Sequence, residues 1–218
     1  VPHLRRIFSV GFPIGLNEGS IQLFGAVLII FIASMGVEQL AVHNVAWNVF
    51  HLSHVLSLGF MTATSILVGQ ALGAGDLPGL KSIRRTSHYV VLMASFPMLL
   101  ALYFFRNEIA VTYSIDGATK TLWLQICFCI LFLKLLDDIA LAGQGFLLGV
   151  ERTRVVFLGR FIGVWVVAMP IGYALSAHYN LSGYWIGMAM GTALTLIWFV
   201  KAGSTYLALQ NPKLLAKE

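Results

Sequence analysis

The chain has 218 residues, of which 58% are hydrophobic and only 11% are charged, and its formal net charge at pH 7 is +5. Soluble domains carry about 25% charged residues, so this composition excludes a soluble globule, a disordered chain and a disulfide-stapled domain. The basic excess does not indicate nucleic-acid binding, because no basic run alternates with aromatic residues as a binding groove requires. The class that remains is a polytopic membrane protein.

Long apolar segments predict an all-α membrane protein in which residues 1–218 form a single domain. A span needs about 20 mostly apolar residues, and breaks rich in glycine, proline or charge separate six such segments. The alternating segments of about ten residues that a transmembrane barrel requires do not occur. We therefore expect a bundle of six transmembrane helices, with spans at roughly 9–34, 44–72, 87–105, 121–148, 155–176 and 183–207.

Basic residues gather on one side of the predicted membrane. Six spans place both termini on that side, and only Arg106 and Lys120 fall on the opposite one. Because cytoplasmic segments are enriched in Lys and Arg, both termini are predicted to be cytoplasmic. The residues assigned to the cytoplasmic side are Arg5, Arg6, Lys81, Arg84, Arg85, Arg152, Arg154, Arg160, Lys201, Lys213 and Lys217.

The first predicted span contains a polar group made of Asn17, Glu18 and Gln22. Glu18 and Gln22 are four residues apart and share one face of a helix. A carboxylate at this depth must be protonated, paired or bound to a cation. Glu18 is therefore a candidate cation-binding residue, and the alternative is a structural hydrogen bond to a neighbouring helix.

The second span carries a polar stripe of Asn44, Asn48, His51 and His54, with Trp47 beside it. Spacings of four, three and three residues keep these side chains on one side of a helix. They are expected to line a water-filled cavity that binds cations or relays protons, or else to hold helices together. The two histidines do not have the i,i+4 spacing of helical zinc sites, so no metal ligation is expected.

The fourth span holds the strongest signal, because Lys134, Asp137 and Asp138 lie at its centre. Lys134 can neutralise one acid, but the two acids point about 100° apart around a helix. A second carboxylate in a bundle interior is what ion-coupled transport uses, since it can gain or lose a cation as access alternates. A purely structural Lys–Asp pair is the alternative.

Motifs of enzymes and nucleotide-driven pumps do not occur in the sequence. It has no nucleophile elbow, no P-loop and no H-E-x-x-H zinc motif. We expect no enzymatic activity and no cofactor. The competing possibility of an intramembrane enzyme would require a metal bound by the histidine stripe.

Six short segments, five of which contain glycine, are spread along almost the whole chain. They are residues 11–15 (GFPIG), 40–46 (LAVHNVA), 68–76 (VGQALGAGD), 143–154 (GQGFLLGVERTR), 170–173 (PIGY) and 183–187 (GYWIG). Together they resemble the multidrug and toxic compound extrusion (MATE) family, specifically its C-terminal six-helix lobe. Family members consist of two six-helix lobes related by an internal repeat.

The resemblance implies a secondary active antiporter of the bacterial inner membrane that exports small amphipathic cations in exchange for H⁺ or Na⁺. Its partners would be the N-terminal lobe of the same protein, or a second copy, and membrane lipid. A flippase for lipid-linked saccharides, from the same superfamily, is one alternative. A structural membrane subunit that does not transport is the other.

The resemblance also assigns roles to residues. Some members place an Asp in the fourth helix at the position of Asp137, and a Glu in the first helix that would align with Ile21. This chain has Glu18 one turn earlier. The expected cation-coupling residues are Asp137, Glu18 and Asp138, with Na⁺ at Asp137 as one option. The expected residues of the substrate cavity are Asn44, Asn48, His51, Gln22, Trp47 and Lys134.

Overall fold

A computed structural model describes the backbone of residues 2–210 and the side chains of residues 8–210, and helices account for nearly all of this range. No strand occurs within residues 2–210. The side chains of Arg5 and Arg6, and the whole of Lys213 and Lys217, lie outside the described residues. The helices are α1 (Pro2–Met35), α2 (Val37–Gly73), α3 (Leu77–Phe104), α4 (Arg106–Thr112), α5 (Gly117–Gly149), α6 (Thr153–Phe161), η1 (Ile162–Ala168) and α7 (Met169–Leu209).

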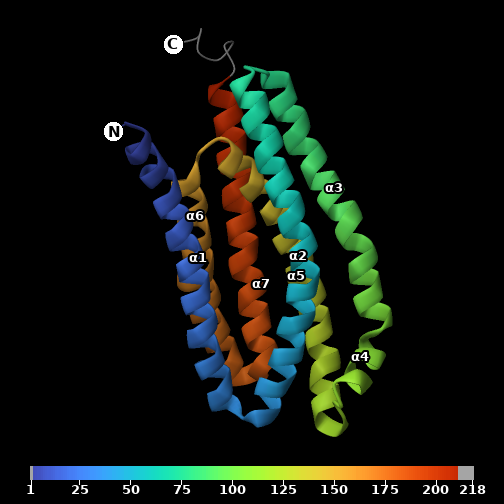
Figure 1. The fold of residues 1–218 in the computed structure, drawn as a ribbon. Coiled ribbons are helices and arrows are strands. Elements are labelled where there is room, and N and C mark those ends of the chain that lie inside the picture. The colour runs from blue at the N-terminus through green and yellow to red at the C-terminus, as the bar shows by residue number, and fades with distance from the viewer. Residues whose placement is uncertain (1, 211–218) are drawn as a thin grey trace.

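The long helices run up and down a common axis, and the start of α1 and the end of α7 lie at the same end of the bundle (Figure 1). α7 is not one continuous rod, because Asn180 has non-helical dihedral angles of φ 49° and ψ −136°. The chain reverses direction there, so that α6, η1 and the first part of α7 descend before the rest of α7 ascends. The chain therefore passes along the bundle six times.

Four helical segments within the described residues are long and apolar enough to cross a membrane. They are Phe8–Met35, Val37–Gly73, Leu77–Phe104 and Thr153–Leu209, the last of which contains the reversal at Asn180. α5 carries Lys134, Asp137 and Asp138 and packs against α2, α3 and α7 in the interior of the bundle. The protein is an all-α membrane protein built as a six-helix bundle.

Helices extend beyond the apolar segments that predict them. α3 begins at Leu77, whereas its predicted span begins at 87. The side chain of Asp76 accepts a hydrogen bond from the backbone N–H of Gly79 at 2.8 Å, which caps the helix. Pro78 lies in the first turn, where no backbone donor is needed. The basic turn that contains Arg84 is therefore helix and not loop.

Two apolar clusters divide the interior, and the charged turn of α5 lies between them. One cluster contains Trp123, Ile130 and Trp185, and the other contains Phe146 and Phe199. On α5 the first cluster ends at residue 133 and the second begins at residue 140. The segment 134–138 thus crosses the middle of the packed bundle, where ionised groups need partners.

Small residues let α5 approach α2 closely. A Cβ atom added at Gly145 would lie 2.5 Å from the carbonyl oxygen of Met61, and one added at Gly149 would lie 2.6 Å from Cβ of Val68. Close approach at small residues is how membrane helices gain packing energy without a hydrophobic driving force between them. The glycines therefore hold the charged turn of α5 against α2.

The second neighbour of α5 is the α6–η1–α7 segment, which contains a π-helix at Ile162–Ala168. Pro170 lies two residues after the end of this π-helix and has no backbone donor, so the hydrogen bonding of this stretch departs from the α pattern. A Cβ atom at Gly163 would lie 2.0 Å from Oγ1 of Thr195. Short π-helical stretches often accompany functional sites, and this one adjoins Arg160.

Candidate functional site

Asp138, Lys134 and Ser57 form a buried polar group between α5 and α2. Asp138 makes an ion pair with Lys134, one turn earlier on the same helix. Ser57 of α2 donates a hydrogen bond to Oδ1 of Asp138 at 2.5 Å, and Nζ of Lys134 donates one to Oγ of Ser57 at 3.1 Å. All three residues are buried. Asp138 is therefore already neutralised by a cation on its own helix.

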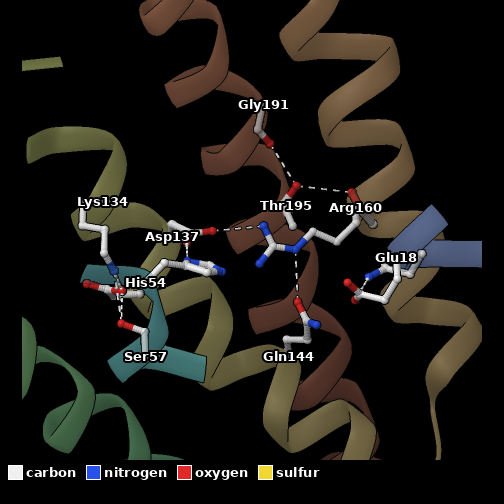
Figure 2. Close-up of polar contacts among 12 residues, drawn as sticks. Glu18, His54, Ser57, Lys134, Asp137, Gln144, Arg160, Gly191 and Thr195 are labelled. Carbon is white, nitrogen blue, oxygen red and sulfur yellow. Dashed lines mark hydrogen bonds and ion pairs between the residues drawn. The ribbon is translucent and has the colours of Figure 1, made fainter. Parts of the chain in front are cut away.

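Asp137 points away from this pair and contacts two other helices. Nη1 of Arg160, on α6, donates a hydrogen bond to Oδ1 of Asp137 at 3.1 Å. Nδ1 of His54, on α2, lies 2.9 Å from Oδ2. Figure 2 shows the carboxylate between the imidazole and the guanidinium. Asp137 is thus not an unpaired carboxylate, contrary to the surplus acid that the sequence suggests.

Arg160 belongs to the bundle interior and not to the cytoplasmic charges with which the sequence groups it. α6 begins at Thr153, so Arg160 lies about two turns inside the helix. Its side chain is only 12% exposed, and its Nε donates to Oε1 of Gln144 at 3.1 Å. Its guanidinium also lies 5.9 Å from the ring centre of Phe199. An arginine inside a predicted span indicates a functional site. That indication is lost when Arg160 is counted with the cytoplasmic basic residues.

Glu18 is not brought into contact with Asp137. Within the described residues its hydrogen bond is with Asn17, whose Nδ2 donates to Oε1 at 3.0 Å. Glu18 and Gln22 are both exposed on the surface of α1, whereas Asn17 is buried. Figure 2 draws Glu18 on the far side of Arg160 from Asp137. Glu18 and Asp137, both expected to take part in cation coupling, therefore do not contact each other in this bundle.

The polar stripe of α2 runs from the surface to the carboxylate. Asn44, Asn48 and His51 are exposed, and Trp47 is half-buried with its ring centre 4.7 Å from that of His51. The rings of His51 and His54 are 6.1 Å apart. His54 is therefore the inner end of the stripe, since it reaches Asp137.

Exposed polar groups on two adjacent helices are unusual for surfaces that face lipid. α1 and α2 pack against each other, and both expose amide or ionisable side chains at positions well inside apolar segments. Such groups normally face a bundle interior or a water-filled space. This side of the bundle can therefore border an aqueous cavity or another protein surface.

Lys134 and Asp138 also border a cavity of about 280 Å³ between α2, α3, α4 and α5. Its walls are mainly aliphatic and aromatic, with Leu99, Leu102 and Phe105 among them. The described residues contain no group of three or more His, Cys, Asp or Glu side chains placed to hold a metal ion. Asp137 and Asp138 each lie close to nitrogen atoms of neighbouring side chains, namely Arg160 and His54 for Asp137 and Lys134 for Asp138.

Comparison with known proteins agrees with this architecture. The MatE family model matches residues 13–174, which is more than half of the chain. Among curated relatives, the chain is 30% identical over 199 residues to the multidrug resistance protein NorM of Photobacterium profundum, covering 88% of this chain and 43% of the relative. It is 26% identical over 200 residues to the probable multidrug resistance protein NorM of Photorhabdus laumondii, covering 89% and 44%. The chain spans about half the length of the curated relatives it matches.

Solved structures show the same fold. A MATE crystal structure in the straight conformation superposes with a TM-score of 0.86 at 18% identity, covering 95% of this chain and 47% of that chain. The outward-facing structure of a multidrug resistance MATE transporter gives a TM-score of 0.84 at 20% identity, with the same coverage. The chain therefore belongs to the MATE family, whose members are transporters and not enzymes.

Proposed function

We propose that the chain is the C-terminal six-helix lobe of a secondary active multidrug exporter that exchanges a small amphipathic cation for H⁺ or Na⁺. The observation that carries the proposal is Asp137, a buried carboxylate held between groups from two other helices. It lies at the inner end of a polar stripe whose outer end is exposed. Curated relatives named multidrug resistance proteins support an exporter over a saccharide flippase.

The exposed polar residues of α1 and α2 are the proposed wall of the substrate cavity. Glu18, Gln22, Asn44, Asn48 and His51 supply one carboxylate and several hydrogen-bonding groups. A second lobe would close the cavity from the opposite side, as transporters built from repeats bind substrate at the interface of the repeats. That lobe would be the N-terminal half of the same protein, or a second copy of this chain.

Coupling requires that the cation and the substrate compete for the same electrostatic site. In our proposal, uptake of a cation at the Asp137 group makes the electrostatic potential of the site more positive, which weakens the binding of a cationic substrate. The substrate is then released, and rocking of the two lobes switches access from one side to the other. Only the difference in affinity between the two states drives this switch.

The proposed location is a bacterial inner membrane with both termini in the cytoplasm. The end of the bundle where α1 starts and α7 ends also carries the α2–α3 and α5–α6 turns (Figure 1). Lys81, Arg85, Arg152 and Arg154 are at or near these turns. An excess of basic residues at one end supports a cytoplasmic position for that end.

The experiment is to measure gradient-driven dye efflux from cells that express the full two-lobed protein with Asp137→Asn. We expect efflux to be lost while the protein remains in the membrane at normal abundance, because the amide carries no charge. Asp116→Asn is the matched control, since Asp116 is exposed and makes no capping hydrogen bond. Normal efflux by Asp137→Asn would refute the role of Asp137. Loss of stability in place of loss of transport would favour a structural subunit.

A further inference from the structure

The guanidinium of Arg160 contacts two oxygen atoms that a metal ion bound by Asp137 could use as ligands. It donates to Oδ1 of Asp137 and to Oε1 of Gln144, both at 3.1 Å. These are a carboxylate oxygen and a neutral amide oxygen, the kinds of ligand that hard cations such as Na⁺ prefer. Figure 2 shows both oxygens directed at the same side chain. The best oxygen ligands near Asp137 are therefore already used by a cation that belongs to the protein.

The other side of Asp137 is also covered. Nδ1 of His54 lies 2.9 Å from Oδ2, within ion-pair distance but without the alignment of a hydrogen bond, so a nitrogen atom lies close to each carboxylate oxygen. Arginine stays charged at every physiological pH, so its positive charge cannot be removed to admit another ion. A Na⁺ ion at Asp137 would place a second full positive charge beside Arg160 in a poorly solvated interior. The residues present do not fit a sodium site.

The remaining charged or titratable groups around this site do not supply a negative charge that would offset a sodium ion at Asp137. α5 contributes Lys134 and Asp138, which neutralise each other. α2 contributes His51, and α7 contributes only the neutral hydroxyl of Thr195, 3.0 Å from the carbonyl oxygen of Gly191. Glu18 of α1 is exposed and bonded to Asn17. Within the described residues, no second carboxylate contacts Asp137 to offset an added sodium ion.

We propose that Arg160 acts as a tethered cation that fills the Asp137 site, excludes Na⁺ and thereby makes the exchange proton-driven. This inference rests on the proposed function and decides between the two coupling ions. A proton, unlike Na⁺, needs no ring of oxygen ligands. The imidazole nitrogen Nδ1 of His54, 2.9 Å from Oδ2 of Asp137, lies within reach of a proton bound there. Arg160 is in this sense a specificity-determining residue and not a transport residue by itself.

The first test is sodium binding by the purified full protein, followed as the melting temperature in NaCl against choline chloride at equal ionic strength. The wild type should show no difference between the two salts. Arg160→Gln should melt about 1–2 °C higher in NaCl, the shift expected for a protein of about twice this length when Na⁺ is present at roughly ten times the dissociation constant of a new site. Arg154→Gln, an exposed arginine of the same helix, is the matched control and should behave as the wild type. Arg160→Lys keeps the positive charge, so its melting temperature should also be the same in NaCl and in choline chloride.

Sodium-dependent stabilisation of the wild type would overturn the proposal, as would a well-folded Arg160→Gln that gains no response to Na⁺. If Arg160→Gln does not fold, the wild-type comparison still decides: insensitivity to Na⁺ supports the proposal and stabilisation by Na⁺ refutes it.

The second test is dye efflux in cells. Wild-type efflux should persist when Na⁺ is replaced by choline and stop when the proton gradient is collapsed. Efflux that stops on removal of Na⁺ instead would overturn the proposal. If the folded wild type exports nothing under any gradient, the proposed function fails, whereas the melting experiment still tests the exclusion of Na⁺ by Arg160. The two failures are therefore distinguishable.

Discussion

Two neighbouring acidic residues on one helix can contact different partners, because their side chains point about 100° apart around the helix axis. Asp138 turns toward α2 and closes an ion pair with Lys134, while Asp137 turns toward Arg160 and His54. The first pair is the more enclosed, since Lys134 and Asp138 are 2% and 0% exposed. We therefore interpret Lys134 and Asp138 as the structural half of the turn and Asp137 as its functional half.

Removing one partner of the buried pair should reveal this structural role. Lys134→Met leaves Asp138 without its cation, so we expect the free energy of unfolding to fall by about 3–5 kcal/mol. The double variant Lys134→Met/Asp138→Leu should recover most of this loss, because an apolar pair of similar volume needs no compensation. Equilibrium unfolding in mixed detergent micelles measures both. A double variant as unstable as the single one would contradict the assignment.

Helices meet closely in this bundle where glycine removes the side chain. A Cβ atom added at Gly149 would lie 2.6 Å from Cβ of Val68 and 2.7 Å from the carbonyl oxygen of Ser65. Gly59, on α2, has no atom within 4 Å of such a Cβ. The two glycines therefore differ in packing, although both lie in helices.

The same substitution at these positions should have opposite effects. Gly149→Ala should lower the free energy of unfolding by about 1–3 kcal/mol, because the methyl group pushes α5 from α2. Gly59→Ala should leave it unchanged or raise it by up to about 1 kcal/mol, the ordinary gain in helix propensity. Thermal unfolding of the two variants side by side measures the contrast. Equal shifts in one direction would show that α5 and α2 are not held by this contact.

Element positions were largely predictable from the sequence, and element ends were not. Apolar runs and glycine-rich breaks locate α1, α2, α3 and α5, as well as the reversal near Asn180. The start of α3 was missed by ten residues, because hydropathy reports contact with lipid and not hydrogen bonding. The π-helix at Ile162–Ala168 has no compositional signature, since its cause is the packing against α7 and the proline that follows.

At the scale of the whole molecule, the bundle exposes polar side chains on one side, as expected if that side faces a second lobe or water. The exposed amides and His51 of α2 lie in an apolar helix, and the chain covers about 43–44% of the length of its curated relatives. A polar face of this kind would be costly against hydrocarbon. We expect it to line the aqueous cavity between two lobes.

Thiol labelling tests this cavity directly in the full protein. Asn48→Cys, in a background where Cys129 is replaced by Ser, should react with a membrane-impermeant maleimide, and excess exported dye should slow the reaction. Ser57→Cys is the control that should not react, because Ser57 is 3% exposed and faces Asp138. An unreactive Asn48→Cys in a folded protein would place this face against lipid.

The sequence by itself determined the class of protein, since low charge and long apolar segments permit only membrane helices. It also located the ionisable residues at membrane depth, because their cost makes them conspicuous in such segments. The partners of each charge were decided by the tertiary structure alone. Arg160 and Asp137 are 23 residues apart and meet only because α6 packs beside α5, whereas Glu18 ends at the surface. Side-chain pairing depends on which helix faces lie together, and that arrangement is a property of the packed bundle and not of any one segment.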